Sequence, residues 1–120
     1  MLIALWIVNA LLALAMLAAG AMKLARTKEA LVAEGMGWAE QFSTGSVKAI
    51  AALEVLGAIG LILPLATGIA PALAPLAAVG LAIIMIGATV VHARRSEQVI
   101  PPVALTLLAV ASAVLGFAAL

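Results

Sequence analysis

The stretch Val47–Pro64, VKAIAALEVLGAIGLILP, is an apolar run that carries a single carboxylate, Glu54. A helix rises 1.5 Å per residue, so this run is long enough to cross most of the ~30 Å hydrocarbon core of a bilayer. An ionised carboxylate in that core costs on the order of 2.5–3.5 kcal/mol on insertion scales. We therefore expect Glu54 to have either a cationic partner or a function.

The composition of the whole chain is that of a membrane protein. Of its 120 residues 68% are hydrophobic and only 9% are charged, whereas a soluble domain has about 25% charged residues. The length accommodates four spans of ~20 residues and leaves no room for an extramembrane domain. The sequence predicts a single domain over residues 1–120.

Turn signals between the apolar runs predict the spans. We expect an all-α, integral membrane, antiparallel four-helix bundle with spans at about 2–23, 46–64, 71–91 and 99–119. Pro64 is expected to end the second span. Proline suits the first turn of a helix, so Pro71 and Pro75 are expected to begin the third span, and Pro101 and Pro102 the fourth.

The basic residues predict the orientation. They are Lys23, Arg26, Lys28, Lys48, Arg94 and Arg95, all in or beside the first and third connections. The positive-inside rule then places connections 24–45 and 92–98 in the cytoplasm and both termini outside, in the cytoplasmic membrane. A cleaved signal peptide is the competing interpretation of residues 2–22, but signal peptides carry their positive charges before the apolar region rather than after it.

Small residues predict the faces along which the helices pack. One stripe of the first span, with steps of four and three, should face protein: Asn9, Ala13, Met16, Gly20 and Lys23. In the second span Gly57 and Gly60 are expected to leave space beside Glu54. In the third, Gly80 and Gly87 are seven residues apart and indicate another packing face.

The polar segment 24–45 is expected to hold a short helix. Thr27 would cap its start and Gly35 would end it, with Leu31 and Val32 in the membrane interface. Trp38 is interpreted first as an interfacial aromatic anchor, and contact with a ligand is the alternative.

The antiparallel order brings Lys23, Glu54 and His92 toward the cytoplasmic mouth of the bundle. Lys23 can pair with Glu54 and keep it charged at tolerable cost. The alternative for Lys23 is a side chain that extends to the headgroups and marks the topology. His92 is a candidate proton relay or an ordinary polar loop residue.

Further polar residues have weaker functional signals. Arg94 and Arg95 are interpreted as anchors to anionic headgroups before they are interpreted as a binding site. Asn9 is expected to form an interhelical hydrogen bond. The absence of cysteine and the single histidine argue against a metal site, and the net charge of +1 with few aromatic residues argues against nucleic acid.

Several motifs together resemble the DoxX-like family of small four-helix membrane proteins. They are AGAMKL (Ala19–Leu24), Met36-Gly-Trp38, LEVLGAIGLILP (Leu53–Pro64) and GLAIIMIGATVVHARR (Gly80–Arg95). The resemblance implies one DoxX-like transmembrane domain with Lys23, Glu54 and His92 as its polar residues. It also implies similarity to the small membrane subunit of a thiosulfate:quinone oxidoreductase and to proteins associated with thiol or oxidative-stress enzymes.

Three functions agree with these features. The first is an accessory subunit, rather than a self-contained enzyme, of a quinone- or thiol-linked redox system, with quinone as its candidate cofactor. Its partners would be the lipid bilayer and a membrane or peripheral redox enzyme. The second is a small proton-coupled four-span transporter in which two copies form the pathway. The third is a membrane scaffold without chemistry, in which Lys23 and Glu54 set the helix register.

Overall fold

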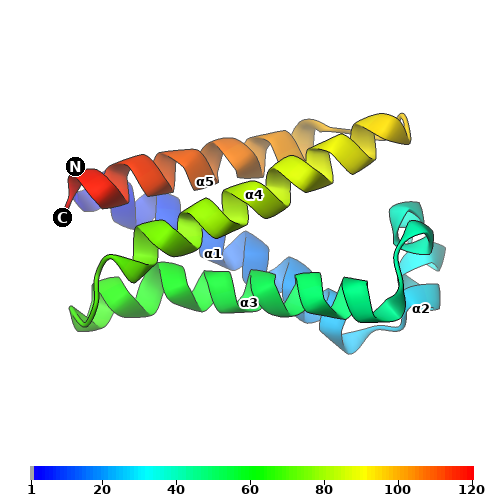
Figure 1. The fold of residues 1–120 in the computed structure, drawn as a ribbon, viewed down its shortest axis with the longest axis horizontal. Helices are drawn as coiled ribbons and strands as arrows, with labels where there is room; N and C mark the ends of the chain where they lie inside the picture. Colours follow the sequence, from blue (N-terminus) through cyan, green and yellow to red (C-terminus); the bar gives the residue numbers. More distant parts are fainter. Residues whose placement is uncertain (1) are drawn as a thin grey trace.

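Four long antiparallel helices form the body of the protein (Figure 1). The computed structural model describes residues 2–120. The elements are α1 (Leu2–Ala25), α2 (Lys28–Ala33), the 3-10 helix η1 (Gly37–Gln41), α3 (Thr44–Thr67), α4 (Leu73–Arg94) and α5 (Ile100–Ala118). Helices α1, α3, α4 and α5 are each long and apolar enough to cross a membrane. The longest dimension, 42 Å, matches a bilayer of about 40–45 Å with its headgroups, and the predicted all-α four-helix bundle is confirmed.

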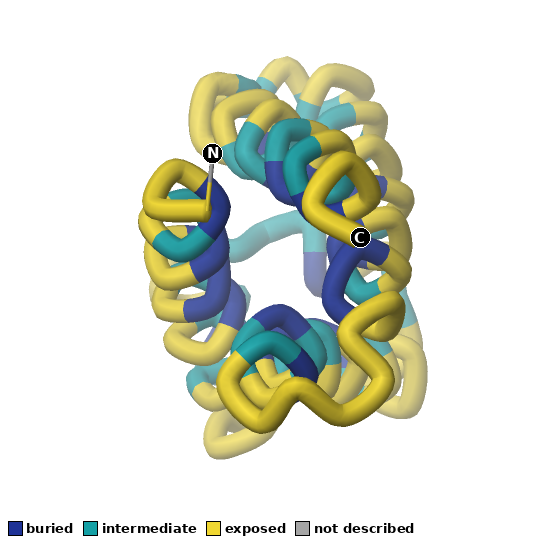
Figure 2. Tube along the Cα trace, turned by 90° about the vertical axis from the view of Figure 1, so that its left-hand side faces the viewer, coloured by how far each residue is buried: buried dark blue, intermediate teal, exposed yellow. Residues whose placement is uncertain are grey.

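Both charged connections lie at one end of the bundle. Helices α1 and α4 each pack against α3 and α5, so the four helices form a ring (Figures 1 and 2). The α1–α3 connection, with α2 and η1, lies at the same end as the α4–α5 turn, and the start of α1, the C-terminus and the α3–α4 turn lie at the other. We call the first of these the charged end.

Each long helix has a buried side toward the interior of the bundle and an exposed side facing outward, as Figure 2 shows. The main core combines five alanines with three leucines and two methionines, whereas many other leucines and isoleucines of the four long helices are exposed. Soluble monomers rarely expose such extensive apolar surface. In a bilayer this pattern is stable, because small residues let helices approach closely and lipid covers the rest.

The predicted stripe of α1 faces protein. Asn9, Ala13, Met16 and Gly20 are buried. A Cβ atom at Gly20 would lie 2.8 Å from the carbonyl oxygen of Ala51, so the close approach of α1 and α3 requires glycine there. The interpretation of this stripe as a packing face is confirmed.

The end of α3 and the start of α4 differ from the prediction. Helix α3 does not end at Pro64 but continues through it to Thr67. In a membrane-spanning helix an internal proline is tolerated, because packing partners and local adjustment compensate for the lost backbone bond. Gly68, with φ 72°, ends it as a left-handed cap, its N–H bonding the Pro64 carbonyl at 3.0 Å. Pro71 precedes α4, whereas Pro75 lies in its first turn, and Pro101 and Pro102 open α5 as predicted.

Two predictions about glycines were wrong. Gly57 and Gly60 leave no space beside Glu54: a Cβ atom at either would collide with Leu81 or Ala77 of α4, so these glycines let α3 and α4 approach. Gly80 and Gly87 are exposed, and a Cβ atom added at either would have no atom within 4 Å. The packing face of α4 is instead made of alanines, leucine and methionine: Ala74, Ala78, Leu81, Ala82 and Met85.

The segment between α1 and α3 folds over the charged end as a cap. Thr27 accepts a bond from Ala30 N and begins α2, and Gly35 (φ 100°) follows its end, as predicted. Leu31 is fully buried and forms a second small core with Ala39 and Val47, so its side chain packs against protein. We refer to residues 26–43 as the cap.

A buried polar link joins three helices near the opposite end of the bundle. Asn9 of α1 donates from Nδ2 to the carbonyl of Leu61 in α3 at 2.9 Å, and Ser112 of α5 donates to Asn9 Oδ1. The amide and the hydroxyl, both inside the apolar core, are thereby bonded, which stabilises the arrangement. The interhelical hydrogen bond expected of Asn9 is present.

We predict that Asn9→Ala lowers the free energy of unfolding by about 1–2 kcal/mol, because interhelical polar contacts in membranes contribute about that amount. Ser112→Ala should cost less, and the double variant should cost no more than Asn9→Ala alone. The measurement is unfolding in mixed detergent micelles followed by circular dichroism. Fully additive losses would contradict a shared network.

Candidate functional site

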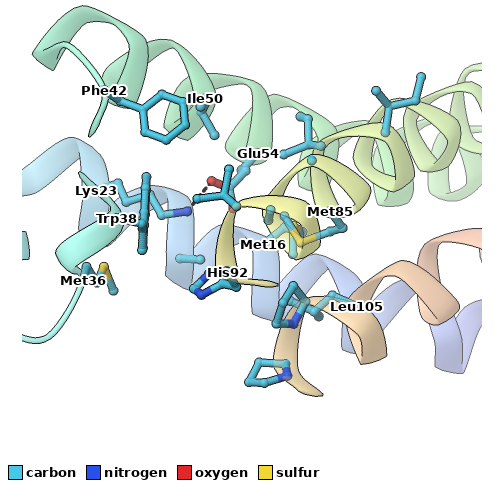
Figure 3. Close-up of a pocket in the computed structure, with 18 of the residues that line it drawn as sticks. Met16, Lys23, Met36, Trp38, Phe42, Ile50, Glu54, Met85, His92 and Leu105 are labelled. Atoms are coloured by element: carbon cyan, nitrogen blue, oxygen red, sulfur yellow. Dashed lines mark hydrogen bonds and ion pairs between the residues drawn. The ribbon is translucent and has the colours of Figure 1, made fainter. Parts of the chain in front are cut away.

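A cavity of about 570 Å³ lies inside the charged end of the bundle (Figure 3). Its volume falls within the range of about 300–1,000 Å³ that is typical of small-molecule sites. Its wall is mainly apolar and comes from α1, the cap, α3, α4 and the first two turns of α5. The lining residues that matter for its chemistry are Met16, Lys23, Met36, Trp38, Phe42, Glu54, Met85 and His92.

Glu54 and Lys23 form an ion pair on the cavity wall. Glu54 belongs to the buried face of α3, about 15 Å along the helix from its first residue at 1.5 Å per residue. Its side chain is 1% exposed, and Oε1 accepts a 2.6 Å bond from Nζ of Lys23, in the last turn of α1. Lys23 is itself only 12% exposed. Pairing makes the buried carboxylate tolerable, since neither charge is left without a partner.

The second carboxylate oxygen of Glu54, Oε2, is buried and has no hydrogen-bond partner among residues 2–120. The great majority of buried acceptors in proteins are bonded. An unbonded oxygen on a cavity-lining residue therefore indicates a position for a donor that the chain itself does not supply.

Lys48 fixes the backbone on which Lys23 is mounted. Its Nζ donates to the carbonyl oxygens of Lys23 at 2.5 Å, Leu24 at 3.0 Å and Arg26 at 2.5 Å. Carbonyls at a helix C-terminus lack intrahelical partners and carry partial negative charge. Since Lys48 belongs to α3, this bond network holds the end of α1 against α3 and keeps Lys23 within reach of Glu54.

The cap places Trp38 over the ion pair. Lys23 Nζ lies 5.4 Å from the centre of the Trp38 ring, a cation–π distance, and Phe42 packs edge-on against Trp38 with ring centres 5.9 Å apart. Figure 3 shows Trp38 beside the Lys23 amine, on the cavity side. This position favours the ligand-contact interpretation of Trp38 over that of a membrane anchor.

The turn between α4 and α5 contacts the cap beside the cavity. His92 lines the cavity, and its Nδ1 lies 3.2 Å from Glu97 Oε1; Nε of Arg95 lies 3.3 Å from Glu97 Oε2. A Cβ atom at Gly37 of the cap would lie 2.7 Å from the Arg95 guanidinium. The two polar connections therefore touch, with Glu97 between the two basic side chains.

The predicted site residues divide into two groups. Lys23, Glu54, Trp38 and His92 line one cavity. Asn9, Arg94 and Arg95 are not among its lining residues: Asn9 lies in the interhelical link, Arg94 is exposed, and Arg95 contacts the cap.

Sequence reasoning missed the methionines of the cavity wall and the partner of His92. The sequence did contain hints for two of them: Met16 lies on the predicted packing stripe, and Met36 lies close to Trp38 in one of the motifs. For Met85 the sequence offered nothing beyond its hydrophobicity. Methionine is flexible and polarizable and adapts to irregular ligands. Glu97 lies in the same short connection as His92, and that proximity was the available signal.

The arrangement is suited to an amphiphilic ligand with hydrogen-bonding oxygens. Lys23 supplies a cationic donor, Glu54 supplies an unbonded acceptor, and Trp38 supplies a flat aromatic surface. Within residues 2–120, no group of three or more His, Cys, Asp or Glu side chains is placed to hold a metal ion.

Comparison with known proteins gives a single family. The family model described as the DoxX-like family matches residues 7–114, which is nearly the whole chain. The curated proteins and the solved structures contain no match.

We predict that the ion pair behaves as one unit in stability measurements. Lys23→Met should lower the free energy of unfolding by about 3–5 kcal/mol, since it leaves a buried carboxylate unpaired. Glu54→Gln should cost less, because the long lysine side chain can extend toward the headgroups. The neutral double variant Lys23→Met/Glu54→Gln should recover most of the loss of Lys23→Met.

Unfolding in mixed micelles measures these differences, and Lys28→Met, which removes the same charge outside the cavity, is the control. A double variant as unstable as the sum of the two single variants would contradict the assignment of a coupled pair.

Proposed function

The chain belongs to the DoxX-like family, and from that premise we propose that it is an accessory membrane subunit that binds a quinone in the cavity at its charged end. The observation that carries the proposal is the buried ion pair that projects into an apolar cavity with one carboxylate oxygen unbonded. A quinone ring is flat and apolar, so it matches the aromatic wall. Its carbonyl oxygens would accept from Lys23, and the hydroxyl groups of its reduced form would donate to Oε2 of Glu54.

The protein residues would have distinct tasks. Lys23 Nζ donates to one ring oxygen and keeps the ring at the polar corner, because a charged donor forms a strong hydrogen bond in an apolar site. Glu54 Oε2 accepts a hydrogen bond from a hydroxyl group of the reduced quinone at the same corner. Trp38 stacks on the ring, and the methionine walls exclude water. When bound, the quinone supplies two-electron, two-proton redox chemistry.

The electrons would come from a partner redox enzyme. The chain has no cysteine, so it has no thiol of its own to oxidise. The charged end, with exposed basic residues such as Arg26 and Arg94, is the surface that a peripheral enzyme at the inner leaflet would approach.

The ion pair favours this function over proton-coupled transport. A transporter carboxylate must be free to exchange its proton for a cargo cation, whereas Glu54 already has the Lys23 cation at 2.6 Å. A scaffold would share the ion pair, but it would have no use for a cavity of about 570 Å³.

We predict that the protein binds 2-methyl-1,4-naphthoquinone, a quinone without a tail. In a Trp6→Phe background Trp38 is the single tryptophan, and its fluorescence should be quenched saturably because it lines the cavity. Lys23→Met/Glu54→Gln in that background should bind at least tenfold more weakly, since a hydrogen bond to a charged group contributes about 1.5–3 kcal/mol.

Arg94→Gln, outside the cavity, serves as the control and should bind as the parent does. Equal binding by the double variant, or no saturable quenching in the parent, would refute the proposed function.

The membrane orientation belongs to the same proposal, since it decides which compartment the partner enzyme occupies. The basic residues lie at the charged end, so the positive-inside rule orients this end to the cytoplasm. The absence of native cysteine makes labelling of single introduced cysteines unambiguous.

In intact cells a membrane-impermeant maleimide should label Ile69→Cys, in the exposed α3–α4 turn, and should leave Glu29→Cys of the cap unlabelled until the membrane is permeabilised. The reverse pattern would show that the charged end faces outward.

A further inference from the structure

A second hollow follows the outside of the bundle between α3 and α4. It measures about 580 Å³ and is lined entirely by apolar residues. Its floor is low where three glycines, Gly57, Gly60 and Gly80, lie along the two helices, and leucines and isoleucines form its sides. We call it the α3–α4 groove.

The groove adjoins the cavity of the charged end. Ile84 of α4 lines both hollows. On α3 the neighbouring residues Leu53 and Glu54 line the groove and the cavity, respectively. Together the two hollows follow the line between α3 and α4 from the cap toward the opposite end of the bundle.

The groove has the length and chemistry of a hydrocarbon chain site. Along α3 it extends from Leu53 to Pro64, about 16 Å at 1.5 Å per residue. It has no charged lining residue, and neighbouring large side chains such as Leu56 and Leu63 are exposed on the surface that faces lipid. An amphiphile with its ring at Lys23 and Glu54 would therefore have its tail directed into this groove.

We propose that the natural ligand is a long-tailed quinone whose ring occupies the cavity and whose isoprenoid tail passes Ile84 and lies in the α3–α4 groove. This inference rests on the proposed function and adds to it the class of ligand and its route: the ligand enters sideways from the bilayer between α3 and α4, ring first toward the charged end. The groove meets the cavity at Ile84, and this adjacency, rather than the groove alone, supports this occupant.

Gly80 offers a way to fill the groove without disturbing the fold. It lines the groove, is exposed, and has no atom within 4 Å of the position of an added Cβ. Leucine is also a better helix former than glycine. Gly80→Leu should therefore fold normally and place its side chain where the tail lies. Ala10→Leu adds the same side chain to an exposed position of α1 that lines neither hollow, and is the matched control.

The test compares two ligands with the same naphthoquinone ring, one without a tail and one with a four-unit isoprenoid tail, by Trp38 quenching in the Trp6→Phe background. We expect Gly80→Leu to weaken binding of the tailed ligand about tenfold and to leave binding of the tail-less ligand unchanged. Ala10→Leu should change neither. Equal effects on both ligands, or no effect on the tailed one, would overturn the inference while leaving the proposed function standing.

A second measurement does not depend on the variant. A naphthoquinone with a photoreactive diazirine at the end of its tail should crosslink to residues 56–64 of α3 and 73–80 of α4. Crosslinks spread evenly over the outward faces of all four long helices would place the tail in bulk lipid and overturn the inference. If the tail-less ligand fails to quench Trp38 in the parent, the proposed function itself fails, which is a distinguishable result.

Discussion

One ion pair between α1 and α3 is the constraint to which the rest of this structure is adapted. A carboxylate inside hydrocarbon is tolerable only with a partner, and Glu54 has Lys23 at 2.6 Å. That contact fixes how far α1 and α3 can slide past each other. It also requires the end of α1 to stay in place, which the bonds from Lys48 to three carbonyls achieve.

The cap is as much a part of the site as the transmembrane helices. Its small core of Leu31, Ala39 and Val47 attaches it to the start of α3, and this attachment positions Trp38 beside Lys23. The ion pair is consequently sheltered from water by a short connecting segment. A connection that could be taken for a plain linker supplies one wall of the cavity.

Much of the fold, and part of the site, could be predicted from the sequence. Hydropathy indicated the spans, and antiparallel order predicted that Lys23, Glu54 and His92 meet at one end. The sequence could not show whether each glycine lies on the packed or on the exposed face of its helix. Helix α4 is apolar on nearly every side, so it has no polar face that would have placed Gly80 on the outside. The burial of Leu31 and the approach of Glu97 to His92 depend on how the connecting segments fold, which hydropathy does not indicate.

The pairing of the helices also bears on the ion pair. Helix α1 packs most extensively along α3, and α4 along α5, so each half of the chain is a hairpin of consecutive spans. Lys23 and Glu54 both belong to the first hairpin. The first two spans therefore contain both members of the pair, so the countercharge of the acidic side chain comes from the same half of the chain and does not depend on the second hairpin.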